Sequence, residues 1–221
     1  MCGRYKMTAD QLELFDKFSY LEQDEYFDIH GYKKRPEIFP GTSILGINNQ
    51  HKAEDLWWTI EDKDNNGIWR RAVNAKAENV LWAGMFKDAF KNDRVLIPAT
   101  ALFEWQDQPD KSKKKFEIWF DEPVFAFGGI ARDCQIKGET KRCAVIMTTK
   151  PNDIFAEIHN SKQRQAVVIH EYDYEKWLSP VTHYDDLKPM LAPLPAEETH
   201  FKPCEAEASP DEGAGVQSSL F

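Results

Sequence analysis

The first residues that could do chemistry stand at the start of the chain, which reads Met1-Cys2-Gly3-Arg4. If Met1 is removed, Cys2 becomes the first residue and carries a free amine and a thiol on adjacent carbons, a pair that no internal cysteine offers. An α-amino group titrates near ~8 and a free thiol near ~8.5, so small environmental shifts supply the reactive form of each at neutral pH. The alternative is an inert cysteine near a terminus.

Three internal polar residues also stand in suggestive surroundings, and each has a purely structural alternative. Asn74 lies in the stretch AVNAKAE before a predicted helix, where its amide could simply cap the helix. Glu104 lies between Phe103 and Trp105 in ALFEWQ, where strand alternation could point it at solvent. His159 ends the predicted helix IFAEIH, where it could complement the helix dipole.

Hydrophobic periodicity predicts the elements that must position these residues. Capping-box spacing from Thr8 to Gln11 predicts a helix over 9–18, two prolines predict a loop over 33–41, and apolar residues at helical intervals predict a long helix over 76–91. Strands rich in β-branched and aromatic residues are predicted at 43–48, 54–59, 94–98, 102–106, 115–120, 124–131, 141–148 and 166–169. Short helices are predicted at 151–159 and 172–178.

This order of elements favours an α+β fold, a single domain with a curved, mostly antiparallel, barrel-like sheet flanked by helices. The domain is expected to occupy residues 1–191, and the Pro- and Glu-rich segment 192–221 is expected to be a disordered acidic tail. The net charge of −9 argues against a nucleic-acid partner at first sight, but most of it lies after Tyr184. Basic clusters elsewhere, such as Lys111 to Lys115, allow local positive surface.

Composition also limits which cofactors the site could use and in which compartment the protein could work. The four cysteines form no CxxC pair and no zinc-type spacing with histidine, so we expect neither a metal site nor a cofactor. No apolar stretch is long enough to cross a bilayer, and there is no signal-type apolar region near the start. We therefore expect a cytoplasmic protein with no membrane partner.

Four segments, taken in order, resemble the SOS-response-associated peptidase family, also called abasic-site processing proteins. They are MCGRY, VNAKAE, RVLIPATALFEWQ and VIMTTKPNDIFAEIHNSKQRQAVVI, and the resemblance covers about residues 1–178. It implies a nucleoid-associated DNA-damage (SOS response) protein that senses abasic sites in single-stranded DNA, and we expect it to act there as a monomer. In this chemistry the amine of Cys2 condenses with the open-chain sugar aldehyde to an imine, and the thiol closes a thiazolidine ring on the same carbon. An associated lyase step through the imine is also implied.

The resemblance assigns roles residue by residue. Glu104 would be the general acid and base, His159 would shuttle the proton that opens the sugar ring, and Asn74 would hold the terminus or the sugar in line. The implied DNA-binding residues are Arg4, Pro40, Trp58, Lys76, Trp105, Thr148 and Arg164. Among them, Pro40, Trp58 and Trp105 would form an apolar wall for the flanking bases.

Two departures from the family pattern affect the phosphate contacts. Lys76 stands in NAKAE where the family usually has NARAE, which replaces a bidentate guanidinium with a point charge and should weaken the grip. The family's RMP after the histidine corresponds here to Arg164-Gln165-Ala166. The covalent chemistry further requires that Met1 be removed, because a retained methionine converts the amine of Cys2 to an amide.

Two other functions remain open at this stage. The first is a thiol (auto)peptidase, a hydrolase in which Cys2 is an N-terminal nucleophile assisted by Glu104 and His159. The second is a module that binds single-stranded DNA or the sliding clamp without covalent chemistry. The last five residues, Gln217 to Phe221, resemble the pentapeptide with which bacterial proteins dock into that clamp.

Overall fold

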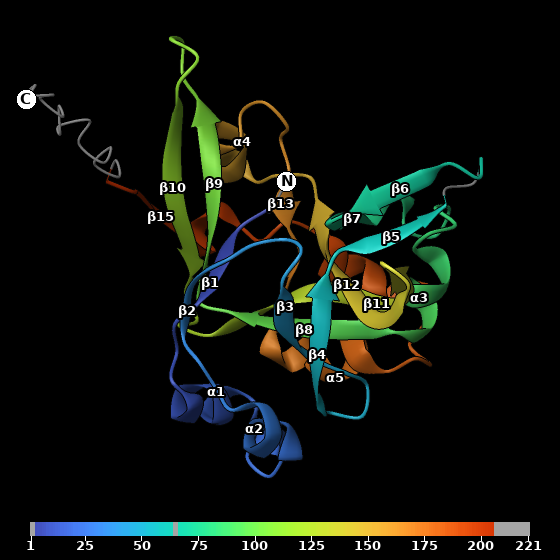
Figure 1. Ribbon diagram of the computed structural model, residues 1–221. Helices are drawn as coiled ribbons and strands as arrows, with labels where there is room; N and C mark the ends of the chain where they lie inside the picture. The colour runs from blue at the N-terminus through green and yellow to red at the C-terminus, as the bar shows by residue number, and fades with distance from the viewer. Residues whose placement is uncertain (1–2, 64–65, 206–221) are drawn as a thin grey trace, which may run out of the picture.

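The computed structural model describes residues 3–63 and 66–205, and a small closed barrel forms its centre (Figure 1). Five strands pair in a ring: β12 (Glu139–Thr149), β4 (Ala53–Trp58), β3 (Ser43–Ile47), β8 (Arg94–Ala99) and β11 (Phe125–Ile136), which pairs back onto β12. The contact of β12 with β4 is parallel and the other four are antiparallel. Every residue of β8 is buried, because side chains cover both faces of this strand. The α+β fold with a barrel-like sheet is therefore confirmed.

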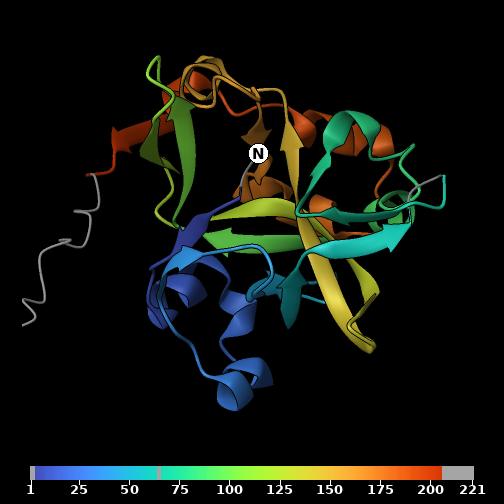
Figure 2. The same cartoon turned by 45° about the horizontal axis from the view of Figure 1, so that its top comes forward.

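A second sheet stands beside the barrel and carries part of the site. Its strand order is β15 (Thr199–Pro203), β10 (Lys113–Phe120), β9 (Ala101–Asp107), β1 (Tyr5–Met7) and β2 (Arg35–Ile38). The hairpin of β5 (Ile60–Lys63) and β6 (Trp69–Ala72) projects on the opposite side of the molecule from the β9–β10 hairpin in both views (Figures 1 and 2). The short strands β7 (Asn74–Lys76), β13 (Gln165–Ala166) and β14 (Val168–Ile169) pair with β12 or β11.

The helices are short and lie around the sheets. The α-helices are α1 (Gln11–Lys17), α2 (Glu25–His30), α3 (Lys87–Asn92), α4 (Asp153–Ile158), α5 (Tyr174–Leu178) and α6 (Tyr184–Leu187). Single 3₁₀ turns are η1 (Ser19–Leu21), η2 (Ala77–Asn79), η3 (Glu171–Asp173), η4 (Lys188–Leu191) and η5 (Ala196–Glu198). A capping box does start α1, but it joins Asp10 to Glu13, not Thr8 to Gln11.

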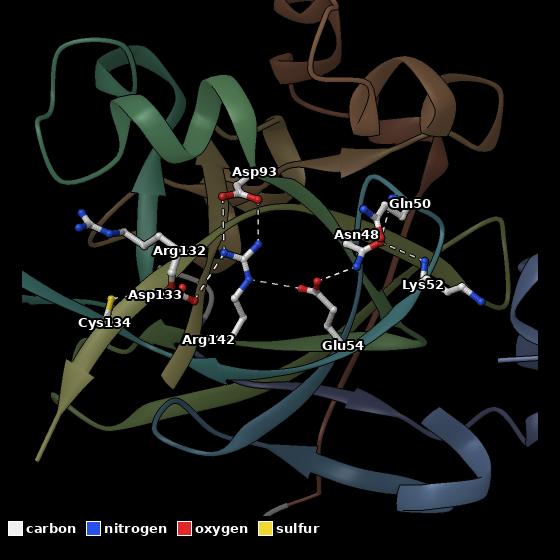
Figure 3. A network of polar contacts seen from close by, with 9 residues as sticks. All are labelled: Asn48, Gln50, Lys52, Glu54, Asp93, Arg132, Asp133, Cys134 and Arg142. Atoms are coloured by element: carbon white, nitrogen blue, oxygen red, sulfur yellow. Dashed lines mark hydrogen bonds and ion pairs between the residues drawn. The ribbon is translucent and has the colours of Figure 1, made fainter. Parts of the chain in front are cut away.

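An ion-pair network holds the barrel where β12 meets β4 over only two residue pairs (Figure 3). Arg142 on β12 lies 2.8 Å from Asp93 and 3.5 Å from Glu54, and Asn48 donates to Glu54 at 2.6 Å. Burial acts to lower the pKa of the Arg142 guanidinium. The hydrogen bond from Arg142 to Asp93 and the charges of the surrounding acids outweigh this effect and raise the pKa above its ordinary value. The network thus joins β12 to β4 and to Asp93, the residue before β8, at the place where the backbone pairing of β12 with β4 is short.

Three predictions about the elements were wrong. The segment 76–91 is not one helix: it contains the end of β7, η2, a turn and α3. The loop expected at 33–41 contains β2, and Pro36 is tolerated because β2 is an edge strand, where a missing N–H breaks no ladder on the outer side. The chain from 192 to 205, expected to begin a disordered tail, instead forms η5 and β15, which pairs with β10.

Candidate functional site

Glu104 lies in the middle of β9 and is only 3% exposed. Its neighbour Phe103 is also buried, because β9 is flanked by β1 and β10 and is covered by α4. The alternative in which strand alternation turns Glu104 to solvent is therefore wrong. Burial raises the pKa of Glu104 from its usual 4.5 to about 7, because the carboxylate is poorly solvated, while the nearby charge of Lys162 acts in the opposite direction.

His159 follows the last residue of α4 and faces Glu104. Asn152 caps the start of this helix, and the backbone N–H of His159 donates to the carbonyl of Phe155 at 2.8 Å. The ring Nδ1 lies 3.0 Å from the carbonyl oxygen of Arg164, which can only accept, so Nδ1 carries the hydrogen. The Nε2 atom therefore presents its lone pair, 3.7 Å from Oε2 of Glu104.

The protonation states of this pair follow from burial. His159 is 4% exposed, and burial lowers its pKa from 6.5 to about 4, with a smaller lowering by Lys162 and an opposing rise from the Arg164 carbonyl. A ring that is neutral at pH 7 cannot complement the dipole of α4 as a cation, which excludes the structural alternative for this residue. At neutral pH the site therefore holds a neutral imidazole and a carboxyl group near half-protonation.

Hydrogen bonds from the loop after α4 to the β9 backbone hold the pair together. The amide of Asn160 accepts from the backbone N–H of Asp107 and donates to its carbonyl, both at 3.0 Å. One residue earlier on β9, the side-chain amide of Gln106 donates to the backbone carbonyl of Glu157 in α4 at 3.1 Å. Since Asn160 directly follows His159, these bonds fix the imidazole against the strand that carries the carboxyl.

The two groups lie at a cavity of about 300 Å³ that opens at the side of the β9–β10 hairpin. Its lining residues are Gly3, Arg4, Glu104, Trp105, Lys113, His159, Ser161 and Lys162. The cavity thus combines an acid–base pair, an aromatic ring and cations, a set that suits a polar, anionic reactant. Gly3, the residue covalently attached to Cys2, is one of its walls.

Arg4 and Trp105, both expected to bind DNA, lie side by side at the mouth of this cavity. The guanidinium of Arg4 stacks between the rings of Phe39, at 4.4 Å, and Trp105, at 4.9 Å, and it pairs with Glu37 at 3.4 Å. Lys115 shares the same carboxylate and also lies over Trp105. Pro40, next to Phe39, is half-buried in the turn after β2.

Arg164 and Thr148 are engaged within the protein. The guanidinium of Arg164 forms a two-pronged hydrogen bond with Glu78, at 2.7 and 2.9 Å, and donates to the carbonyl of Thr148 at 2.7 Å. The pairing lowers the pKa of Glu78, and the side chain of Thr148 is fully buried. Lys76, opposite Thr148 in the parallel pairing of β7 with β12, is exposed.

Trp58 does not lie on a surface that could face DNA. Its side chain is 0% exposed, its indole N–H donates to the carbonyl of Val73 at 2.9 Å, and its ring meets the edge of Tyr5 at 5.3 Å. The prediction that Trp58 stacks on a base is therefore not compatible with the structure. Exposed tryptophan rings lie elsewhere, at Trp69 in β6 and Trp82 after η2, which are 62% and 78% exposed.

Asn74 is the first residue of β7 and not a helix cap, so its structural alternative also fails. Its amide donates weakly to the carbonyl of Ile146 at 3.4 Å, and its Oδ1 is buried with no hydrogen-bond partner in residues 3–63 and 66–205. It lines a separate cavity of about 350 Å³ with Asn66, Arg70, Ala72, Ala83, Gly84, Met85 and Phe86. The structure thus brings Glu104, His159, Arg4 and Trp105 together and leaves Asn74 on a separate cavity.

Met1, Cys2 and the docking-like segment Gln217 to Phe221 lie outside the described residues. Within the described ranges, no group of three or more His, Cys, Asp and Glu side chains could hold a metal ion. In the same ranges, no helix has the length and apolar character needed to cross a membrane.

Sequence reasoning missed four residues that line this cavity, namely Gly3, Lys113, Ser161 and Lys162. Gly3 and Lys162 are close in sequence to Cys2 and His159, and this adjacency was the only available signal. Lys113 belongs to the basic cluster Lys111 to Lys115, which the sequence indicates only as positive surface. Its position at the cavity depends on the pairing of β10 with β9, which places Lys113 opposite Asp107.

Comparison with known proteins agrees with this architecture. The profile of the SOS response associated peptidase (SRAP) family matches residues 1–209, so the chain belongs to that family. Relatives include "Abasic site processing protein YoaM" of Bacillus subtilis (strain 168), 28% identical over 211 residues, 90% of this chain and 88% of the relative. "Abasic site processing protein YedK" of Escherichia coli (strain K12) is 23% identical over 80% of this chain and 79% of its own length.

Solved structures show the same fold at low sequence identity. A protein from Bacteroides thetaiotaomicron superposes with a TM-score of 0.79 at 21% identity, covering 92% of both chains. A protein from Bordetella bronchiseptica superposes with a TM-score of 0.75 at 17% identity, covering 93% of this chain and all of that one. The expected family and fold class are thereby confirmed.

Proposed function

We propose that this protein processes abasic sites in single-stranded DNA by forming a covalent thiazolidine adduct through Cys2 after removal of Met1. One observation carries the proposal. The buried pair of Glu104 and His159 lies at a cavity that also has Gly3, the neighbour of Cys2, in its wall. Relatives named as abasic site processing proteins match 80 to 90% of the chain, which supports the same substrate.

The reaction balances with these groups alone. The open-chain sugar aldehyde and the Cys2 amine form a carbinolamine, and loss of one water gives an imine. The thiol then adds to the imine carbon, its proton ending on nitrogen, and the sum is aldehyde plus aminothiol giving thiazolidine plus water. Each step moves a proton at a heteroatom, and no redox partner is needed.

The environment of Glu104 suits this sequence of proton transfers. A carboxyl with a pKa of about 7 is present in both forms at neutral pH, so it can donate a proton to the leaving hydroxyl and accept one from the attacking nucleophile. His159, neutral and with its Nε2 lone pair directed at Glu104, would accept the proton released when the sugar ring opens. If, before the thiol adds, the imine loses a proton from the adjacent sugar carbon to a base and expels the 3′-phosphate by elimination, the same groups support the expected lyase step.

The surroundings of the cavity favour binding of the DNA strand. Trp105, with Arg4 stacked on it, offers an aromatic face for a flanking base. Pro40 directly follows Phe39, whose ring also lies against Arg4. Lys76 is exposed and would contact a phosphate. Asn74, with its unsatisfied Oδ1, would hold the sugar or the chain terminus.

The test is adduct formation on an oligonucleotide with a single abasic site. Wild type, Cys2→Ser and the matched thiol control Cys204→Ser are mixed with the DNA without borohydride, denatured and separated by electrophoresis, and intact mass reports whether Met1 is absent. We expect a covalent band for wild type and Cys204→Ser and none for Cys2→Ser. A band that persists in Cys2→Ser would refute the proposal.

The same pair could instead assist Cys2 as a peptidase nucleophile, and the same proteins separate the two functions. Peptide release that depends on Cys2 and needs no DNA, with no covalent band, would favour the peptidase. DNA binding without a band would favour the non-covalent module.

We also propose that Gln217 to Phe221 docks the protein on the sliding clamp, an idea supported only by the sequence of this segment. Its leucine and phenylalanine would fill an apolar pocket. Pull-down with the clamp of the same organism, comparing the full chain with one ending at Ala214, tests this. Equal capture of both would refute it.

A further inference from the structure

The reaction cavity has three cations in its wall, and two of them already have anionic partners. Arg4 pairs with Glu37, and Lys113 lies 3.0 Å from Asp107. The third cation, Lys162, is exposed and makes no ion pair within the part of the chain that the structure describes. Lys162 is therefore the cavity cation that can meet an anion without first giving up a partner.

Arg164, the arginine that family resemblance assigns to phosphate binding, cannot meet a phosphate without giving up partners. Arg164 is 12% exposed on its side chain, and its guanidinium is committed to Glu78 and to the carbonyl of Thr148. Releasing it would break a two-pronged ion pair with Glu78 and the bond to the Thr148 carbonyl, and would leave the mostly buried guanidinium without these partners. The residues 160–163, between His159 and Arg164, instead bring a different cation to the cavity.

These residues form a turn with a fixed shape. The backbone N–H groups of Lys162 and Gln163 both donate to the carbonyl of His159, at 3.3 and 2.8 Å, and Gln163 adopts a left-handed conformation with φ of 53°. Asn160 anchors one end to Asp107, and the side chain of Gln163 donates to the carbonyl of Ala156. The anchored turn holds Lys162 at the cavity, where its charge is felt by both Glu104 and His159.

We propose that Lys162 binds a DNA phosphate next to the abasic sugar, in place of the arginine that follows the histidine in the family pattern. This inference rests on the proposed function, because it needs a DNA strand in the cavity. An ammonium is a compact point charge without the fork of a guanidinium, so it should add affinity for a phosphate and little geometric selectivity. A single exposed contact of this kind is worth up to about fivefold in affinity near 0.1 M salt.

The experiment measures binding separately from the covalent step. The full-length protein is titrated with a single-stranded oligonucleotide that carries a tetrahydrofuran residue, an abasic analogue without an aldehyde, at several salt concentrations. Lys162→Met should bind up to about fivefold more weakly, and its log–log salt slope should be shallower by about 0.7, the value for one phosphate on a single strand. Lys162→Arg should restore both, and Lys52→Met, an exposed lysine in the β3–β4 turn, should match wild type.

A methylphosphonate, which removes the charge of one phosphate, identifies the contact. Placed on the correct side of the tetrahydrofuran residue, it should weaken wild type as much as Lys162→Met does and should weaken Lys162→Met no further. The inference is overturned if Lys162→Met keeps the wild-type slope, or if the methylphosphonate affects both proteins equally on either side. Wild-type adduct formation on true abasic DNA, measured in parallel, shows separately whether the proposed function itself has failed.

Discussion

Replacing Glu104 with glutamine should change how stability depends on pH. The amide has the shape of the protonated carboxyl but cannot ionise. In the folded protein Glu104 keeps its proton up to a pKa of about 7, whereas in the unfolded chain it loses the proton near 4.5. Between these values the folded state binds more protons, so the free energy of unfolding of wild type falls as pH rises, by about 3 kcal/mol in total.

Burial of His159 changes the free energy of unfolding with pH in the opposite direction. Comparing wild type with Glu104→Gln subtracts this effect, because both proteins bury the imidazole. Its pKa is lowered to about 4 by folding, so the unfolded state binds the extra proton and stability rises with pH between about 4 and 6.5. Wild type and Glu104→Gln share this contribution. The difference between their free energies of unfolding therefore reports the ionisation of Glu104, including its interaction with His159 at 3.7 Å.

Urea unfolding at a series of pH values from 4.5 to 8 measures this difference. We expect the free energy of unfolding of Glu104→Gln, relative to that of wild type, to increase by about 3 kcal/mol from pH 4.5 to 8, with most of the increase between pH 5 and 7.5. A pH-independent offset added to this rise would leave the reasoning intact, because it reflects packing of the amide. A difference that stays flat across the whole range would refute it, since the carboxyl would then titrate alike in both states.

Three further substitutions test the structural framework. Asn160→Ala removes two hydrogen bonds to the β9 backbone and should cost about 1 kcal/mol in urea unfolding while slowing adduct formation, because His159 is no longer held against Glu104; an unchanged rate would contradict this role. Arg164→Ala should cost about 2 kcal/mol and leave the salt slope of DNA binding unchanged, and a shallower slope would show that this guanidinium reaches a phosphate after all. Arg142→Ala should lower stability by about 2 kcal/mol without affecting DNA affinity, and stability equal to wild type would show that the barrel does not depend on its ion pairs.

The strands were the part of the fold that local sequence predicted well. Runs of β-branched and aromatic residues correspond to β8, β9, β10, β11 and β12, because such residues suit a buried, pleated surface wherever the strand is placed. The segment 76–91 failed for the opposite reason. Val80 and Phe90 are both buried, but against different parts of the core, since the chain first pairs β7 with β12 and only later forms α3. Pairing with a strand about 70 residues away overrode the helical period.

For the site, the sequence by itself determined the chemical types and the family, because a cysteine at position 2, a glutamate within a predicted strand and a histidine at the end of a predicted helix are visible in order along the chain. Only the tertiary structure decided their environments. Burial raises the pKa of Glu104 and lowers that of His159, and neither environment follows from neighbours in sequence. The same holds for Arg164, whose partner Glu78 is 86 positions away, and for Lys162, which is the cavity's unpaired cation in the described chain. Solvation and charge pairing depend on what surrounds a side chain in space, which the sequence specifies only through the completed fold.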